Sequence, residues 1–308
     1  MVPRPDPLSA EAAVILGSPD YPRYDGPFDA AAAQQIRREQ ARLRTPVVNE
    51  MAERLGVLAA KEDLAAVPVV TVRAEDCRDD AFALYVHGGG FTGGMPRDMT
   101  SVLMAAELRI PVFSVDYSHA PEQVFPTALE QVLRAWEKLS ATGRPGVAFG
   151  VSAGANLLLG AMQERRRLGG ALPAALGLFS PWVDLAGDGD SRRFNDGRDP
   201  VLRWADQLEI AATAYVGEAS VRNPLVSPIH AAYGPWLPPT LITSGTRDLF
   251  LSDCVRLARR MRRAGASTAR LEVWEEMWHA FNTQPHLPEA AEARAEMRAF
   301  LLGAVGLG

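Results

Sequence analysis

A serine lies in a sequence context that could make it a nucleophile. Ser152 occupies the centre of G-x-S-x-G in "FGVSAGAN", directly after an apolar run and directly before a helical pattern. A sharp strand-to-helix turn forces such a serine into a strained backbone conformation and pushes its Oγ out over the edge of a sheet. Gly150 and Gly154 remove the Cβ atoms that would collide in so tight a turn. The pattern therefore predicts Ser152 as a nucleophile for acyl transfer.

A serine hydroxyl becomes reactive when a base removes its proton and an acid orients that base. Asp248 follows the apolar run of "PTLITSGTRDLF", and His279 follows the next run, "ARLEVWEEMWHAF". Asp248 lies 96 residues after Ser152, and His279 lies 31 residues after Asp248. The order serine, acid and histidine, each at the end of a strand, predicts a catalytic triad of these three residues.

Other residues could supply the base or the acid. His286 is a second candidate base, although it lies beyond the strand end in "TQPHLPE". Asp253 is already inside the next helical pattern, and Glu275 and Glu276 precede the histidine on the same strand end. We prefer Asp248 because it stands directly at a strand end.

Glycines after another apolar run could supply the amides that stabilise a tetrahedral anion. In "LYVHGGGFTGG", five of the seven residues after the histidine are glycine. Fixed N–H donors lower the barrier to acyl transfer, each by about 10²–10³ in rate, and missing side chains let the substrate approach. We expect Gly89, Gly90 and Ala153 to donate these hydrogen bonds, while His87 and Gly88 shape the turn.

The same glycines also satisfy G-x-G-x-x-G, the pattern of a dinucleotide-binding turn. The pattern spans Gly88 to Gly93, and Asp116 ends a later strand, about where a ribose-binding acid would lie. Pro96 and Asp98 predict that the following helix starts too late for its N-terminus to meet a pyrophosphate. A nicotinamide-dependent oxidoreductase is nevertheless the main alternative function from another class, because the glycine pattern and Asp116 both fit it.

Strands and helices must bring the candidate residues to one place. From residue 82 onward, strand-like and helical patterns alternate, which predicts a mostly parallel sheet with helices on both faces. The middle strands are continuously apolar, as expected when both faces are covered. The strand patterns cover residues 67–74, 82–87, 111–117, 146–151, 174–180, 239–245 and 269–276. The helical patterns cover residues 98–109, 126–141, 153–168, 252–264 and 288–302.

Two regions depart from this alternation. Residues 1–60 are predicted to form loop and helix, and residues 184–236 combine a polar loop, a helix and a return segment with proline and aromatic residues. Ligands bind at the carboxyl edge of open α/β sheets, so both regions are candidates for a cap over that edge. The chain is therefore divided into N-terminal cap helices (1–60), a first core part (61–183), a cap insert (184–236) and a second core part (237–308).

Composition narrows the functional classes further. The chain has 308 residues, a formal net charge of −5 and a pI near 5.6, which argues against nucleic-acid binding. Cys77 and Cys254 form no CxxC pair and H-E-x-x-H spacing is absent, so we expect no disulfide framework and no metal site. The N-terminus lacks the apolar segment of a signal peptide, and no apolar run is long enough for a membrane span. We expect a cytoplasmic protein that needs no cofactor.

Several ordered motifs together resemble the hormone-sensitive-lipase-like group of α/β-hydrolase carboxylesterases. They extend from about residue 82 to about residue 303. In chain order they are "YVHGGGFTGG", "VDYSHAPEQVFPTALEQV", "GVSAGANL", "SPWVDL", "NPLVSPIHA", "LPPTLITSGTRDLFLSD" and "WHAF". The resemblance implies the α/β-hydrolase fold, the triad and oxyanion donors given above, and a cap built from the N-terminal helices and the 184–236 insert.

The resemblance also implies a serine carboxylesterase that hydrolyses short- to medium-chain acyl or aryl esters through an acyl-enzyme intermediate. A lactone hydrolase would use the same triad. Some relatives with this fold have lost catalysis and bind small ligands, typically with the histidine replaced, whereas here all three triad residues are present. The expected partner is a small-molecule ester, and a homodimer is left open because some relatives pair through an edge strand.

The sequence departs from this group at several positions. Val151 stands where many members have aspartate or threonine, and Ala280 follows the histidine where glycine is common. Ser118 and His119 lie in "DYSHAPE", where "DYRLAPE" is usual. None of these changes removes a reacting group.

Overall fold

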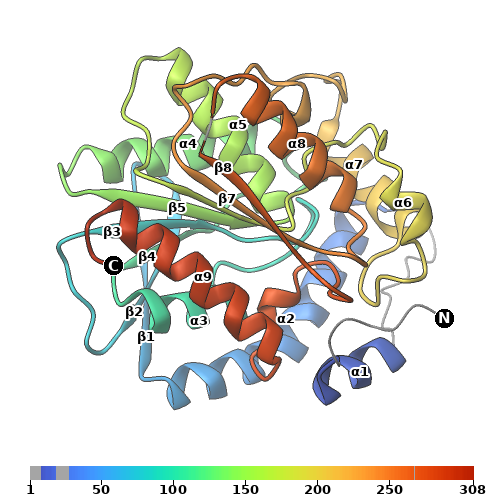
Figure 1. Cartoon of the computed structure of the whole chain (residues 1–308), viewed down its shortest axis with the longest axis horizontal. Helices are drawn as coiled ribbons and strands as arrows, with labels where there is room; N and C mark the ends of the chain where they lie inside the picture. Colours follow the sequence, from blue (N-terminus) through green and yellow to red (C-terminus); the bar gives the residue numbers. More distant parts are fainter. Residues whose placement is uncertain (1–7, 19–27, 267) are drawn as a thin grey trace.

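One sheet organises the chain in a computed structural model that describes residues 8–18, 28–266 and 268–308. The described residues form eight strands in the spatial order β1-β2-β4-β3-β5-β6-β7-β8 (Figure 1). The strands are β1 (Val57–Asp63), β2 (Pro68–Ala74), β3 (Phe82–Val86), β4 (Val112–Val115), β5 (Gly146–Val151), β6 (Leu176–Phe179), β7 (Thr240–Gly245) and β8 (Ala269–Trp274). β2 pairs antiparallel with β1 and β4, and the other neighbours are parallel. The carboxyl ends of the parallel strands therefore share one edge.

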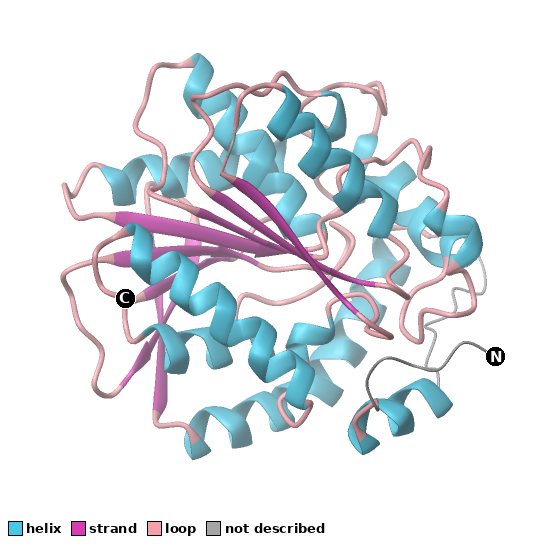
Figure 2. Cartoon of the chain, viewed as in Figure 1, coloured by secondary structure: helices cyan, strands magenta, loops and turns pink. Residues whose placement is uncertain are grey.

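Helices cover both faces of this sheet (Figures 1 and 2). The core on one face contains α4 (Thr127–Ser140), α5 (Ala153–Arg167) and α8 (Leu251–Arg263). The core on the other face contains α2 (Ala30–Arg54), α3 (Met99–Leu108) and α9 (Pro288–Ala304).

The strand β3 shows why its apolar run is continuous. Phe82, Leu84 and Val86 pack into the core with α4, α5 and α8. Ala83 and Tyr85, which alternate with them, pack into the core with α3 and α9. Because successive side chains point to opposite faces, a strand covered on both faces must be apolar at every position.

The strand β1 is not among the strands predicted from the sequence, and the boundary drawn at residue 60 falls inside it. Six of its seven residues are exposed. It therefore lacks the apolar run by which a buried strand is recognised. Main-chain pairing with β2 holds it in place, from Val57 opposite Ala74 to Asp63 opposite Pro68.

The N-terminal region is largely helical where the structure describes it, and the insert contains short helices separated by loops. α1 (Ala10–Gly17) and α2 precede β1. The insert contains α6 (Ser191–Phe194), a π-helical turn η1 (Trp204–Leu208), α7 (Glu209–Val216) and a 3₁₀ turn η2 (Pro228–His230), and a further 3₁₀ turn η3 (Phe281–Thr283) follows β8. Residues 1–7 and 19–27, which belong to the proposed N-terminal cap, lie outside the described residues.

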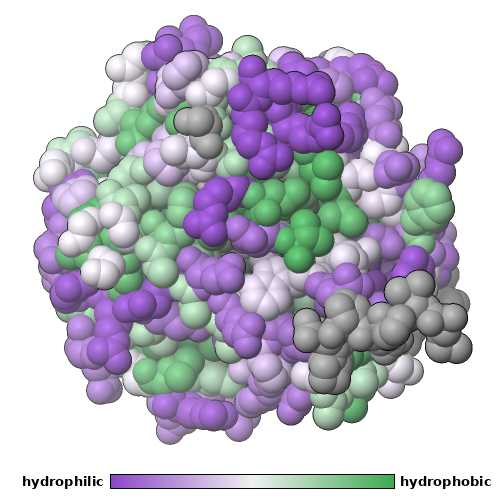
Figure 3. Space-filling view, in the orientation of Figure 1, coloured by the Kyte–Doolittle hydropathy of each residue, from purple (hydrophilic) through white to green (hydrophobic). Residues whose placement is uncertain are grey.

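The outward faces of several helices are strongly polar. Figure 3 shows a hydrophilic region over α8, where Arg259, Arg260, Arg262 and Arg263 are exposed. Within the described ranges, no helix has the length and apolar character that a bilayer crossing requires.

Candidate active site

The three residues predicted to form a triad lie at the carboxyl edge of the sheet. Ser152 directly follows β5, Asp248 lies three residues after β7, and His279 lies five residues after β8. β5, β6, β7 and β8 are parallel neighbours. The fold thus brings three distant segments of the chain to the same edge.

Ser152 lies in a tight turn between β5 and α5. Its φ is 56° and its ψ is −120°, and such a conformation costs a non-glycine residue about 1–3 kcal/mol. The Ser152 N–H donates to the Phe179 carbonyl at 2.9 Å. A Cβ on Gly154 would lie 2.6 Å from the Val86 carbonyl carbon, and one on Gly150 would lie 2.8 Å from the backbone of α5. The turn packs so closely that these two positions require glycine.

Asp248 and His279 form a buried acid–base pair. The His279 Nδ1 lies 3.2 Å from the Asp248 Oδ1. The Asp248 carboxylate also accepts hydrogen bonds from the Ser244 hydroxyl at 3.0 Å and the Phe250 N–H at 2.9 Å. Burial raises the pKa of Asp248, but the neighbouring His279 and the Phe250 N–H outweigh burial, and the pKa lies below its usual value. A carboxylate therefore faces the imidazole at neutral pH.

The glycine turn lies beside Ser152. A Cβ on Gly88 would lie 3.3 Å from the Ser152 Cβ. Gly89 has a φ of 120° and Gly90 a φ of 63°, and a Cβ on Gly89 would lie 2.7 Å from a backbone nitrogen of the same turn. In the part of the chain that the structure describes, no backbone carbonyl accepts from the N–H groups of Gly89, Gly90 or Ala153. Bare backbone with unpaired amides is thus present next to the serine.

His87 is buried in the glycine turn as a neutral ring. It stacks on Tyr117 with ring centroids 4.2 Å apart, and its Nδ1 lies 2.8 Å from the Gly88 carbonyl oxygen. The Tyr117 hydroxyl donates to the His87 carbonyl at 3.0 Å. Burial, assisted by the nearby His119, lowers the pKa of His87 to about 3. These contacts suit a residue that shapes the turn.

The competing acids and base are engaged elsewhere or exposed. Asp253 forms a buried ion pair with Arg192 at 3.0 Å. Glu276 forms an ion pair with Arg247. His286 is exposed in the segment between η3 and α9. These ion pairs and the exposure of His286 favour Asp248 as the acid and His279 as the base.

The start of α3 argues against a dinucleotide site at the glycines. α3 begins at Met99, six residues after Gly93. Its N-cap Asp98 accepts from the Ser101 N–H, and the Ser101 hydroxyl accepts from the Asp98 N–H. This capping box occupies the helix terminus that a pyrophosphate would need.

Three polar residues that contact Asp248 or the loop of His279 were not singled out by the sequence analysis. The Ser180 hydroxyl follows β6, accepts from the N–H after the histidine at 3.0 Å, and contacts Asp248. The Asn195 side-chain amide donates to the Asp248 carbonyl at 2.9 Å. Asp199 accepts from the His279 N–H at 3.1 Å. The sequence signals were weak: Ser180 opens the motif "SPWVDL", and Asn195 and Asp199 lie in the polar stretch "NDGRDP", which predicts a loop.

Known proteins resemble this chain in sequence and in structure. A family model described as an alpha/beta hydrolase fold matches residues 83–283. The chain belongs to the α/β-hydrolase family. An acetyl-hydrolase from Streptomyces hygroscopicus is 36% identical to this hydrolase over 238 residues, which is 75% of this chain and 78% of that protein.

Solved structures extend the likeness over nearly the whole hydrolase. The crystal structure of an esterase has a TM-score of 0.89 and 27% identity and covers 98% of both chains. An esterase of the bacterial hormone-sensitive lipase family has a TM-score of 0.82 and 30% identity, covering 97% of this chain and 99% of that one. The expected fold and group are confirmed: the chain is a carboxylic ester hydrolase of the hormone-sensitive-lipase group.

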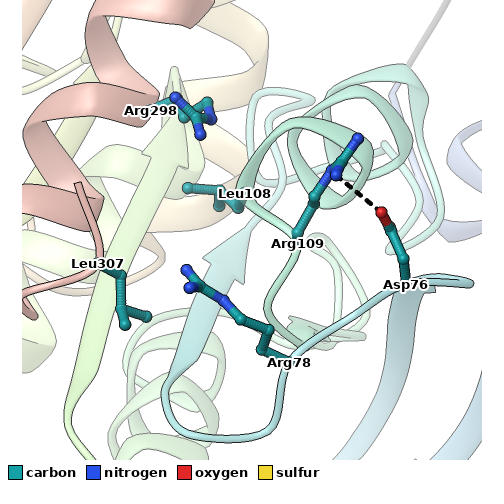
Figure 4. A pocket seen from close by; sticks show the side chains of 6 residues that line it. All are labelled: Asp76, Arg78, Leu108, Arg109, Arg298 and Leu307. Atoms are coloured by element: carbon teal, nitrogen blue, oxygen red, sulfur yellow. Dashed lines mark ion pairs between the residues drawn. The ribbon is translucent and has the colours of Figure 1, made fainter.

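Two hollows in the described surface of the hydrolase lie away from Ser152. One of about 300 Å³ is lined by Asp76, Arg78, Leu108, Arg109, Arg298 and Leu307 (Figure 4). Several of these residues precede β3 or β4, so this hollow opens at the opposite, amino edge of the sheet. The other, of about 540 Å³, lies between η2 and α8. Over the same described ranges, no three His, Cys, Asp or Glu residues are grouped so as to hold a metal ion.

Proposed function

We propose that this hydrolase cleaves carboxylic esters with a triad of Ser152, His279 and Asp248. His279 Nε2 takes the hydroxyl proton of Ser152, and the Oγ forms a bond to the ester carbonyl carbon. The tetrahedral anion collapses, the bond to the alcohol oxygen breaks, and the alcohol leaves with the proton from His279. Water then attacks the acyl-serine with the help of the same base, which releases the acid and restores Ser152.

The role of Asp248 follows from its charge and its place against His279 Nδ1. A carboxylate accepts only, so Nδ1 carries the hydrogen of this contact and Nε2 is left free to accept the serine proton. When the imidazole becomes protonated, the same carboxylate stabilises the positive charge. The lowered pKa of Asp248 keeps it ionised for this role.

The amides of Gly89, Gly90 and Ala153 are the proposed donors to the tetrahedral anion. Their N–H groups have no backbone acceptor among the described residues, and the first two belong to the turn that packs on Ser152. Donors fixed before the reaction need no reorganisation when the negative charge develops. Three such donors beside the nucleophile suit an oxyanion hole.

The observation that carries this proposal is the buried Asp248–His279 contact at the same sheet edge as the strained Ser152 turn. Ser152→Ala should abolish hydrolysis of p-nitrophenyl acetate and leave the thermal unfolding temperature unchanged. A serine-directed organophosphate should label wild-type Ser152, as located by mass spectrometry. Wild-type turnover by the alanine variant would overturn the assignment. Saturable ligand binding without label or hydrolysis would favour a non-catalytic receptor, and tight NAD(H) binding without label would favour an oxidoreductase.

A short or medium acyl group, or an aryl ester, is the proposed substrate class. The likeness to an acetyl-hydrolase supports a short acyl group. Buried aromatic rings also occupy the region beside the histidine: the Phe250 ring lies edge-on to His279 at 4.9 Å and stacks on Trp182 at 5.4 Å. A panel of p-nitrophenyl esters from acetate to laurate, run beside lactones of different ring size, tests this class. Faster cleavage of lactones than of any linear ester would favour the lactonase alternative.

A homodimer and a cytoplasmic location complete the proposal. β8 ends the sheet, so its outer edge has no neighbouring strand in the described sheet and could pair with a second copy. Light scattering should then give twice the chain mass of 33.3 kDa, and a mass equal to one chain at every concentration would contradict the dimer. Cell fractionation tests the location.

A further inference from the structure

We infer that Asp199, a buried carboxylate of the 184–236 segment, is a positioning residue that fixes the loop of the acid and the loop of the base relative to each other. The inference rests on the proposed function, because Asp248 and His279 must work as a pair for their relative position to matter. Asp199 lies 49 residues before Asp248 and 80 residues before His279, and its side chain is fully buried.

The contacts of Asp199 join three segments of the chain. Its Oδ2 accepts from the His279 N–H at 3.1 Å and from the Leu249 N–H at 3.3 Å. Its Oδ1 accepts from the Val201 N–H at 3.0 Å and from the Leu202 N–H at 3.2 Å. One oxygen therefore anchors Asp199 in its own loop, and the other holds both the amide of the base and the residue next to the acid.

Two residues that precede Asp199, Asn195 and Ser191, also bind the loop that carries Asp248. The Asn195 side-chain amide donates to the Thr246 carbonyl at 3.1 Å and to the Asp248 carbonyl at 2.9 Å. The Ser191 hydroxyl donates to the Leu249 carbonyl at 2.7 Å. The segment from α6 to Asp199 thus binds the backbone on both sides of Asp248.

The loop of the base needs such anchoring because its backbone is strained. Glu276 has a φ of 60° and Ala280 a φ of 53°, both in the left-handed region. Each costs a non-glycine residue about 1–2 kcal/mol and persists only where surrounding contacts hold it. His279 lies between them, and its N–H is held by Asp199. Loss of that acceptor should let the imidazole drift from the serine.

The charge of Asp199 supports the same role. Within the described residues, the titratable groups whose charges shift the pKa of Asp199 are Asp248, from the loop after β7, and His279, from the loop after β8. Burial, with the like charge of Asp248, raises the pKa of Asp199 to about 7, although the contact with His279 opposes the rise. An ionised carboxylate accepts from all four N–H groups, whereas a protonated carboxyl turns part of this acceptor capacity into an O–H donor. Protonation of Asp199 as the pH falls should therefore weaken the hold on both loops.

Asp199→Asn tests the inference, since asparagine keeps the size of the side chain but loses the charge and half of its acceptors. The kcat for p-nitrophenyl acetate should fall by about ten- to hundredfold, as expected when a reacting group is misplaced by up to 1 Å. KM should change by no more than about twofold, because Asp199 is not proposed to touch substrate. In a plot of kcat/KM against pH, the acid limb of Asp199→Asn should fit a single ionisation. The acid limb of the wild type should be steeper, because protonation of Asp199 adds to the loss of activity.

A matched control is Asp196→Asn, which makes the same chemical change three residues earlier. Asp196 contacts Arg203 at 2.8 Å on the partly exposed side of the segment. Its kcat, KM and pH profile should equal those of the wild type. Titration of reactive serines with the organophosphate counts the active molecules, so that kcat is given per folded molecule. If Asp199→Asn does not accumulate as folded protein, Asp199→Ser is measured in the same way.

A kcat per reactive site within twofold of the wild type, with an unchanged acid limb, would overturn the positioning role of Asp199. Failure of the proposed function gives a different result. In that case the organophosphate does not label Ser152 in the wild type, and Ser152→Ala keeps its activity. Label on Ser152 together with normal kinetics of Asp199→Asn rejects the positioning role alone.

Discussion

The substitution Gly154→Ala tests whether close backbone contact between the serine turn and β3 sets the position of Ser152. A Cβ on Gly154 would lie 2.6 Å from the Val86 carbonyl carbon and would also strike the carbonyl oxygens of Val86 and His87. Non-bonded carbon atoms pack at about 3.5–4.0 Å. Gly154→Ala therefore requires the turn and β3 to separate by about 1 Å. All three obstacles are backbone atoms, so no change of rotamer can relieve the clash.

The separation has two measurable consequences. Overpacking of a rigid core costs about 1–3 kcal/mol, so the unfolding temperature should fall by several degrees. The same movement shifts Ser152 relative to His279 and to the amides of Gly89 and Gly90. A misplacement of about 1 Å lowers catalysis by about hundredfold, so kcat/KM should fall by that factor.

Hydrolysis of p-nitrophenyl acetate and thermal unfolding measure these two effects. Gly303→Ala is the matched control, because Gly303 is also helical, in the last turn of α9, and nothing lies within 4 Å of a Cβ placed there. Alanine is about 1 kcal/mol better than glycine in a helix, so the control should keep full activity and equal or greater stability. Wild-type activity and stability of Gly154→Ala would refute the contact argument.

Two further predictions concern buried charges and are measured by urea unfolding. Burial lowers the pKa of His87 to about 3, so between about pH 6.5 and 3 the unfolded chain binds a proton that the folded chain does not. His87 alone should therefore lower the free energy of unfolding by about 2–3 kcal/mol between pH 7 and pH 4.5, so the wild type should lose about that much more stability than His87→Gln over this interval. Arg192→Met removes the buried partner of Asp253 and should cost about 3–5 kcal/mol at pH 7. The cost should be smaller at pH 5, because burial raises the pKa of Asp253 to about 6 and a neutral carboxyl needs no cation; equal costs at both pH values would contradict this.

The central sheet and its helices could be predicted because burial selects apolar residues in recognisable patterns. The helix predicted over residues 126–141 is Thr127–Ser140, and the strand predicted over residues 146–151 is Gly146–Val151. β1 could not be predicted in this way. Its residues are exposed and its hydrogen bonds are made by the main chain, so side-chain type carries little information about it.

Ala280 shows how a departure from the family pattern is accommodated. Glycine is common at this position in the group that the motifs resemble, and the backbone explains the preference, since φ is 53°. Alanine is held in this left-handed conformation by a hydrogen bond from its N–H to the Ser180 hydroxyl at 3.0 Å. The sequence alone shows the substitution, and the contact explains why it is tolerated.

The candidate triad and Asp199 differ in what the sequence can reveal. Ser152, Asp248 and His279 have distinctive side chains at the ends of recognisable strands, so residue type and place in the chain both point to them. The partners of Asp199 are main-chain N–H groups, which nearly every residue has, so no pattern marks the amides of Leu249 and His279 as needing an acceptor. Because those amides belong to the two loops that carry the acid and the base, a substitution in the 184–236 segment can change kcat without contact with substrate. The triad motif alone does not predict that dependence, since it follows from how the insert packs on the sheet edge.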